Sequence, residues 1–379
     1  MNTRFDAGDL SFAEYIARCR EMIARVHAGR HGPDLERIVA GNAPFELMPT
    51  GPDTAGKHRK YRRGVLLIHG LTDSPYLMRH LAAFFQRNGF RVMAILLPGH
   101  GTQPGDLLDV RWRDWSDSVA YGTDRLAEEA DEIYLVGYSA GGALSVYQSL
   151  FDDRVRGLFL FAPALRVSPR AAYANLHKLY SWLIPSARWV DIKPDRDIYK
   201  YESFSKNAAA QMHALTRAIG HRMQDRRLNI PVFAAASRDD VTVDVSATLE
   251  FMARASHPAS KLMLYSTDIG DLPSGIAAEK IELISSAIPQ QRILGSAHTA
   301  IVQSPADAHY GRAGEYASCQ HYFPDDMEKY TACIAHPESA QEGELTEANL
   351  ASGLLRRLTY NPAYDALELS MKRFIERLS

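Results

Sequence analysis

Short apolar segments alternate with helix-length amphipathic segments over the first half of the chain. The apolar segments are rich in Val, Ile, Leu and Phe and do not alternate strictly with polar residues. They cover residues 64–68, 90–96, 132–136 and 155–161. Strands of this kind are buried on both faces, as in a parallel sheet whose helices form the crossovers. The sequence therefore predicts an α/β protein with a doubly wound, mostly parallel sheet, its helices at residues 76–88, 115–130 and 140–151.

The alternation stops after residue 161 and resumes near residue 231. Residues 165–229 are rich in helix formers and aromatic residues and contain no strand-like segment, so we expect a helical cap there. A further strand is expected at 231–236, followed by a helix from about Asp244, which is placed to cap it, to Ala255. The last strands are expected at 262–265 and 292–294.

Both ends of the chain add segments to this pattern. Apolar residues recur at helical spacing over residues 12–39 and predict an amphipathic helix. Residues 309–351 mix Gly, Pro, Tyr and acidic residues and predict an irregular insertion before a closing helix near 363–378. The expected organisation is an N-terminal helical extension (1–60), a core (61–164 and 230–379) and a helical cap (165–229).

Charge and cysteine content narrow the class of protein. The 379 residues carry 43 Lys plus Arg and 45 Asp plus Glu, a balance that gives no electrostatic case for nucleic acid. No apolar segment is long enough to span a bilayer, and the first residues lack the apolar segment of a secretory signal. We therefore expect a soluble, cytoplasmic protein. A Cys319–Cys333 disulfide is conceivable, but reduced thiols are the expectation for a cytosolic enzyme.

The sharpest chemical signal is Gly-Tyr-Ser-Ala-Gly-Gly at residues 137–142, which directly follows one expected strand and directly precedes an expected helix. A serine between a strand and a helix occupies a tight, strained turn, and neighbours without side chains let the chain double back there. The following helix N-terminus favours developing negative charge. Ser139 is therefore the candidate nucleophile. The alternative is a glycine-rich turn that only packs a helix against a strand.

A serine nucleophile needs a histidine base and an orienting carboxylate. In a fold of this kind they follow the serine in the order acid, then histidine. Asp239 and Asp240 both follow the strand expected at 231–236, and we choose Asp240 from its spacing. His298 follows the last apolar segment and is flanked by small residues, so it is the candidate base. His309 is a rival that follows no strand.

Other histidines have alternative roles. His321 is a second rival base, and a metal site of His298, His309 and His321 is an alternative that lacks any compact ligand spacing such as His-Glu-x-x-His. His69 lies in an early strand-to-loop turn, and we expect it to brace that loop by hydrogen bonds. His100 lies in a second tip loop and is expected to be structural.

Four segments, residues 69–75, 97–101, 112–115 and 137–142, resemble the α/β-hydrolase superfamily, and more narrowly its carboxylesterase and monoacylglycerol-lipase-like branch. The resemblance implies an α/β-hydrolase fold without cofactor or metal. It also implies a triad of Ser139, Asp240 and His298, with the backbone N–H groups of Leu71 and Ala140 as oxyanion donors.

The resulting expectation is a serine hydrolase that cleaves small carboxylic esters with short-to-medium acyl chains through an acyl-enzyme. An amide, peptide or thioester hydrolase with the same triad stays open, because one oxyanion site serves every acyl transfer. A binding protein without turnover is the third alternative. Several cap residues are candidate lining for an acyl pocket, or else pack the cap's own core: Tyr173, Tyr180, Leu183, Ile184 and Trp189.

Overall fold

The computed structural model describes residues 4, 6, 8–29, 34–50, 60–167 and 185–378. The helices are α1 (Phe12–His27), α2 (Leu35–Asn42), α3 (Arg79–Arg87), α4 (Trp112–Glu129), α5 (Ala140–Ser149), α6 (Lys206–Asp225), α7 (Val245–Arg254), α8 (Met327–Ala335), α9 (Glu347–Ala351) and α10 (Tyr364–Glu376). The strands are β1 (Phe45–Leu47), β2 (Tyr61–Ile68), β3 (Arg91–Ile95), β4 (Ala130–Tyr138), β5 (Val155–Phe161), β6 (Trp189–Asp191), β7 (Phe204–Ser205), β8 (Val232–Ser237), β9 (Lys261–Ser266), β10 (Ile281–Ser285), β11 (Gln341–Gly343) and β12 (Leu355–Arg357).

Eight of these strands form one sheet in the order β1-β3-β2-β4-β5-β8-β9-β10. The pairs β2–β3, β2–β4, β8–β9 and β9–β10 are parallel, and β1 pairs with β3 in the antiparallel direction. This order confirms the predicted doubly wound, mostly parallel sheet. The helix cap expected at Asp244 is also confirmed, because its side chain accepts a hydrogen bond from the N–H of Ser246 at the start of α7.

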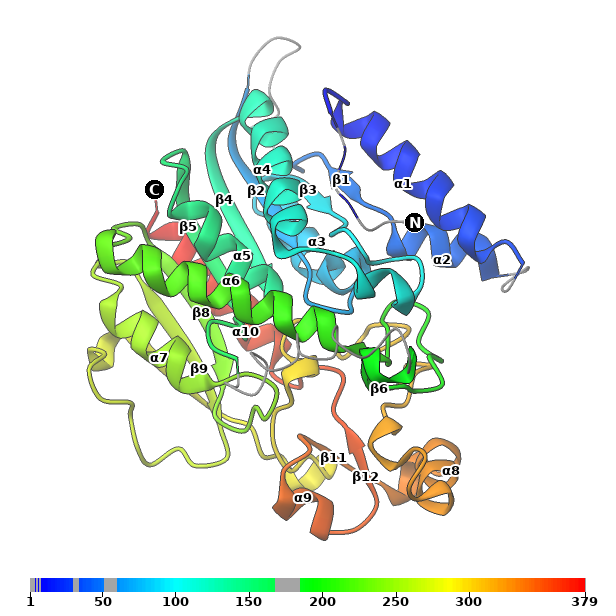
Figure 1. Cartoon of the computed structure of the whole chain (residues 1–379). Helices are drawn as coiled ribbons and strands as arrows, with labels where there is room; N and C mark the ends of the chain where they lie inside the picture. The colour runs from blue at the N-terminus through cyan, green and yellow to red at the C-terminus, as the bar shows by residue number, and fades with distance from the viewer. Residues whose placement is uncertain are drawn as a thin grey trace. The chain divides into compact units, whose positions relative to one another are not determined.

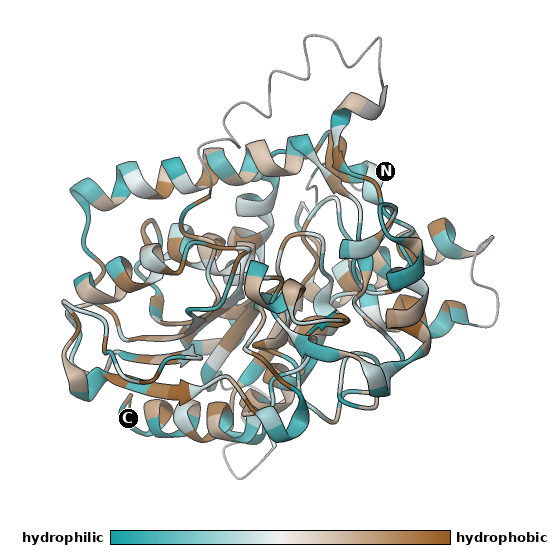
Figure 2. Cartoon of the chain, turned by 90° about the horizontal axis from the view of Figure 1, so that it is seen from below, coloured by the Kyte–Doolittle hydropathy of each residue, from teal (hydrophilic) through white to brown (hydrophobic). Residues whose placement is uncertain are grey.

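The chain divides into two compact units, of which the first comprises residues 1–159 and 164–228. Its core is built on β2, whose residues 65–68 are completely buried, as expected for a strand covered on both faces. Helices α4 and α5 pack on this strand, and α4, α5 and α6 pack on one another (Figure 1). The strands are the more hydrophobic segments, whereas the helices alternate hydrophobic and hydrophilic residues along their length (Figure 2).

The second unit comprises residues 160–163 and 229–379. It contains β8, β9 and β10 with α7 and α10, and a small parallel pair, β11 and β12. A buried cluster that includes Ile293, Ala297 and Leu358 adjoins β11, because the N–H of Leu358 donates to the carbonyl oxygen of Gly343 and Ile293 bridges to Glu342. The segment predicted as an irregular insertion, residues 309–351, contains α8, β11 and α9 and is therefore partly regular.

The structure differs from the sequence predictions at four places. Residues 292–294 do not form a strand; Ile293 makes only isolated bridges to Ile288 and Glu342. The last strand of the sheet is instead β10, which the sequence analysis missed because its residues are only partly buried and include Glu282. The analysis also missed β1, and the helix expected over 12–39 is divided into α1 and α2.

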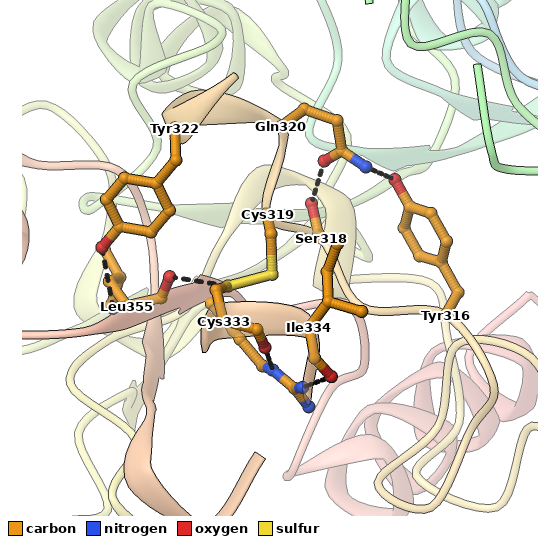
Figure 3. Close-up of a disulfide and its surroundings, with 9 residues drawn as sticks. Tyr316, Ser318, Cys319, Gln320, Tyr322, Cys333, Ile334 and Leu355 are labelled. Carbon is orange, nitrogen blue, oxygen red and sulfur yellow. Dashed lines mark hydrogen bonds between the residues drawn. A yellow bond between two sulfur atoms is a disulfide. The ribbon is translucent and has the colours of Figure 1, made fainter. Parts of the chain in front are cut away.

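Cys319 and Cys333 form a disulfide, with their Cα atoms 6.1 Å apart (Figure 3). The expectation of reduced thiols is therefore wrong for this pair, whereas Cys19 is a free, buried thiol. The cytoplasmic location stays a prediction. Over the described ranges, no helix is both long and apolar enough to cross a membrane.

Candidate active site

Ser139 lies at a sharp turn between β4 and α5, as the sequence predicted. Its backbone has φ 53° and ψ −114°, a conformation that side-chain-bearing residues rarely adopt and that marks strain held by the surrounding structure. The residue is 8% exposed. A strained serine at the end of a strand, followed at once by a helix, is the geometry that presents a nucleophilic oxygen.

Two glycines make this turn possible. A Cβ atom on Gly141 would lie 2.0 Å from the carbonyl oxygen of Ile68, and one on Gly137 would lie 2.3 Å from the carbonyl oxygen of Gly141. No side chain fits at such distances from backbone atoms. The two glycines therefore allow α5 to start directly against β2 and β4, which explains the Gly-x-Ser-x-Gly pattern physically.

The loop that follows β2 lies beside the serine turn. A Cβ atom on Gly70 would lie 3.2 Å from the Cβ of Ser139 and 2.3 Å from Oδ2 of Asp73. Leu71 follows Gly70 and is half-buried, and Ala140 is the first residue of α5, where a backbone N–H has no acceptor within its own helix. The structure thus brings together the loop and the helix start that carry the two predicted oxyanion donors.

Two completely buried histidines fasten this loop to the loop after β3. Nε2 of His69 accepts a hydrogen bond from the N–H of Leu97 at 3.0 Å, and its Nδ1 lies 2.8 Å from the carbonyl oxygen of Gly70. Nε2 of His100 accepts from the N–H of Thr72 at 3.0 Å, and its Nδ1 lies 3.1 Å from the carbonyl oxygen of Pro98. Both rings are therefore neutral with the proton on Nδ1. The predicted bracing role of His69 is confirmed.

Burial keeps both rings neutral over a wide pH range. Removal from water lowers the pKa of His69 well below its usual value, and the neighbouring His100 lowers it further. Burial likewise lowers the pKa of His100 to about 4, although hydrogen bonds to the carbonyl oxygens of Pro98 and Leu97 oppose the shift. A ring held in this way cannot serve as a proton acceptor near neutral pH, so neither histidine competes with His298 as the base.

The sequence analysis missed a second support for this loop. The N–H of Tyr201 donates to the carbonyl oxygen of Thr72 at 2.8 Å, and the Tyr201 ring stacks on His100. Nζ of Lys200 lies 2.9 Å from Oδ1 of the buried Asp73. Both residues come from the segment predicted as the cap, and only their long-range contacts identify them. No local pattern in the sequence marks them.

The second unit brings together Asp240 and His298. Oδ2 of Asp240 lies 2.6 Å from Nδ1 of His298, and the two side chains are 1% and 5% exposed. Oδ1 of Asp240 accepts hydrogen bonds from the N–H groups of Thr242 and Val243 at 2.7 and 3.0 Å. This arrangement fixes both the carboxylate and the orientation of the imidazole.

Opposing effects act on the Asp240 carboxyl. Burial alone raises its pKa, but the charge of His298 and hydrogen bonds from His298, Val243 and Thr242 outweigh burial and lower the pKa below its ordinary value. The adjacent Asp239 points elsewhere: its carboxylate accepts from Thr267, Ser286 and Ser296. The geometry therefore favours the choice of Asp240 over Asp239.

Most of the predicted acyl-pocket residues lie outside the described residues. Tyr173, Tyr180, Leu183 and Ile184 fall within residues 168–184, and Trp189 is half-buried at the start of β6. His309, the rival base, lies 3.6 Å through Nδ1 from Glu315. Within the described part of the chain, no group of three or more His, Cys, Asp or Glu side chains could hold a metal ion.

A family model described as "Serine aminopeptidase, S33" matches residues 59–268, more than half of the sequence. The chain belongs to this family. The match spans β2 to β9 and so includes Ser139 and Asp240, and it ends before His298. Family membership and the mostly parallel sheet together confirm the predicted α/β-hydrolase fold.

Parts of this chain are similar to individual proteins of known name. The chain is 34% identical over 109 residues to a thermostable monoacylglycerol lipase of Bacillus sp. strain H-257, and 33% identical over 85 residues to a carboxylesterase of Bacillus subtilis strain 168. These alignments cover 29% and 22% of this chain, and 44% and 35% of the relatives, so the chain spans less than half the length of either. A soluble variant of the Saccharomyces cerevisiae monoglyceride lipase matches 59% of this chain and 82% of its own, with TM-score 0.43 and 15% identity. A shared fold hosts many activities, so the activity has to be argued from the side chains.

Proposed function

We propose that this protein is a serine hydrolase of small carboxylic esters that uses Ser139, His298 and Asp240 as its triad. The observation that carries the proposal is the buried Asp240–His298 pair, with 2.6 Å between Oδ2 and Nδ1. It fixes the imidazole in the tautomer whose Nε2 accepts a proton. The strained turn at Ser139, beside the Gly70 loop, supplies the nucleophile to which such a base belongs.

In the proposed mechanism, Nε2 of His298 removes the hydroxyl proton of Ser139 as Oγ attacks the ester carbonyl carbon. The N–H groups of Leu71 and Ala140 stabilise the oxyanion of the tetrahedral intermediate. His298 then protonates the departing alcohol, leaving an acyl-enzyme on Ser139. Water attacks that acyl-enzyme by the same route in reverse, with His298 as base and then as acid, which releases the carboxylic acid and restores the serine. Asp240 orients the imidazole and stabilises its charged form throughout.

Ester substrates are favoured over amides by the names of the curated relatives, a monoacylglycerol lipase and a carboxylesterase. The family description, serine aminopeptidase, keeps peptide and amide hydrolysis as the second candidate. The same oxyanion donors serve both reactions, and only the leaving group differs. We propose short-to-medium acyl chains, with the cap as the source of the acyl pocket.

Labelling by a fluorophosphonate probe tests the nucleophile directly. We expect the wild type and Ser149→Ala, a control at the other end of α5, to be labelled, and Ser139→Ala not to be. Hydrolysis of p-nitrophenyl esters from acetate to palmitate, compared with aminoacyl p-nitroanilides, then separates esterase from peptidase. Ser139→Ala and His298→Gln should each lower kcat by about 10³-fold or more. The matched histidine control is His309→Gln, which should retain activity.

Two results of these assays would contradict the proposed esterase activity. Anilide turnover well above ester turnover would establish the second candidate. A wild type that neither labels nor turns over any acyl substrate would contradict both and favour a binding protein.

A further inference from the structure

A carboxylate from the C-terminal insertion holds the backbone of His298. Glu344 follows β11, and its side chain is completely buried. Its Oε2 accepts a hydrogen bond from the N–H of His298 at 2.9 Å. Its Oε1 accepts from the N–H of Leu345, also at 2.9 Å. A buried carboxylate is costly unless its oxygens are fully hydrogen-bonded and its charge is balanced, so a cation is required close by.

Arg357 of β12 supplies that cation and a link to the other member of the pair. Its Nε donates to Oε1 of Glu344 at 2.7 Å and its Nη2 donates to Oε2 at 2.9 Å, a two-pronged contact. The same Nη2 donates to the hydroxyl oxygen of Thr242 at 2.5 Å. The N–H of Thr242 in turn donates to Oδ1 of Asp240 at 2.7 Å.

These contacts close a ring of polar interactions. It runs from the His298 backbone through Glu344, Arg357 and Thr242 to Asp240, and returns to His298 through the 2.6 Å contact of Oδ2 with Nδ1. The ring therefore fixes both ends of the Asp240–His298 pair. Chains of charge-assisted hydrogen bonds in a buried site hold geometry more firmly than single contacts.

The insertion (309–351) that provides Glu344 contains the disulfide, and Arg357 follows it in β12. The N–H of Arg357 donates to the carbonyl oxygen of Ser318, next to Cys319. The neighbouring Arg356 donates through Nε and Nη2 to the carbonyl oxygens of Cys333 and Ile334. Strand β12 is thus attached to both arms of the Cys319–Cys333 loop.

We propose that Glu344 and Arg357 are positioning residues that hold His298 and Asp240 in their working geometry. The inference rests on the proposed function, because it assigns a task to a ring around the proposed base. Neither residue touches the reacting atoms; each acts through the segment it holds. Both lie beyond residue 268, where the family match ends.

Kinetics of single variants measure the contribution of the ring. Arg357→Met should lower kcat about 10- to 100-fold with little change in KM, because sub-ångström displacement of a base reduces turnover more than binding. Arg356→Met is the matched control: it removes a neighbouring arginine with hydrogen bonds to the same insertion but none to Glu344 or Thr242, and it should keep wild-type kcat. Arg357→Lys keeps the positive charge but cannot make the two-pronged contact with Glu344, so its kcat should lie between those of Arg357→Met and the wild type.

Glu344→Gln and Glu342→Gln form a second pair of test and control variants. Glu344→Gln removes the charge that Arg357 neutralises and should lower kcat in the same way. Glu342→Gln alters a carboxylate that accepts from the hydroxyl of Tyr360 instead, and should not.

Thr242→Val covers the risk that the buried substitutions fail to fold. Thr242 is exposed, and valine has nearly the same shape, so the variant breaks the ring at one contact while leaving the core intact. We expect about a threefold lower kcat with an unchanged unfolding midpoint.

A measurement without substrate separates this inference from the proposed function. The Nδ1 proton shared by His298 and Asp240 should give a far-downfield proton NMR signal, assigned by its loss in His298→Gln. Arg357→Met and Thr242→Val should broaden or remove this signal through faster exchange with water, whereas Arg356→Met should retain it.

The NMR signal and kcat together test the positioning role. Loss of the signal with loss of kcat supports the positioning role. Loss of the signal in a protein whose wild type hydrolyses no acyl substrate supports the ring and refutes the proposed function. An unchanged signal and unchanged kcat in folded Arg357→Met and Thr242→Val would overturn the inference.

Discussion

Acid should destabilise this protein partly through His100, because the ring is buried in its neutral form. Its pKa is about 4 in the folded protein, against about 6.5 for an unperturbed histidine. Between these values the unfolded chain binds more protons than the folded one, so the free energy of unfolding falls as the pH falls through this window. From pH 7 to pH 5, His100 alone accounts for about 2 kcal/mol of lost stability.

Two variants remove the titrating imidazole of His100, and each preserves one of its two hydrogen bonds to the backbone. His100→Gln places an amide near the position of Nε2, where it can accept from the N–H of Thr72. His100→Asn places one near Nδ1, where it can donate to the carbonyl oxygen of Pro98. Both should be less stable than the wild type at pH 7, because one backbone group of the loop loses its partner, at about 1–3 kcal/mol.

The test is the loss of stability between pH 7 and pH 5, measured by urea unfolding followed by circular dichroism. Both variants should lose about 2 kcal/mol less than the wild type over this interval. His221→Gln, which replaces an exposed histidine on α6, should behave as the wild type does. Equal acid destabilisation of the wild type and both His100 variants would refute the assignment of a buried, neutral ring.

Three shorter predictions concern other supports of the site. Gly141→Ala puts a Cβ 2.0 Å from the carbonyl oxygen of Ile68, so the free energy of unfolding should fall by about 3 kcal/mol or more in urea titrations, and wild-type stability would contradict this packing. Reduction of the Cys319–Cys333 disulfide, with a sequence separation of 14, should cost about 3 kcal/mol, and a melting temperature unaffected by reductant would show that the bond does not form. Because the pKa of Asp240 is lowered in the fold, its contribution to stability is complete above about pH 4 and is lost as the pH falls further. Asp240→Asn should therefore lose less stability than the wild type between pH 5 and pH 3, and equal losses would refute the assignment.

The local sequence determined the part of this protein whose geometry is set by neighbours along the chain. The serine turn is of this kind: a backbone φ of 53° at Ser139 and the close approach at Gly141 restrict the residue types that fit. The buried strands are of this kind too, because continuous apolar segments are needed wherever a strand is covered on both faces. Even β10 shows the limit of this logic. Its pairing with β9 makes it a strand, although Glu282 interrupts the apolar pattern from which a strand could have been predicted.

Only the tertiary structure decided which distant groups meet. Spacing favoured Asp240 over Asp239 but left both open, and it is Asp240 that contacts His298, 58 residues later. The contact of Glu344 with His298 bridges 46 residues. The pairing of Cys319 with Cys333 was equally open, because two thiols can bond only if the fold brings them close together. Such contacts depend on how loops close and how side chains pack in three dimensions, and the periodicity of a segment carries no information about either.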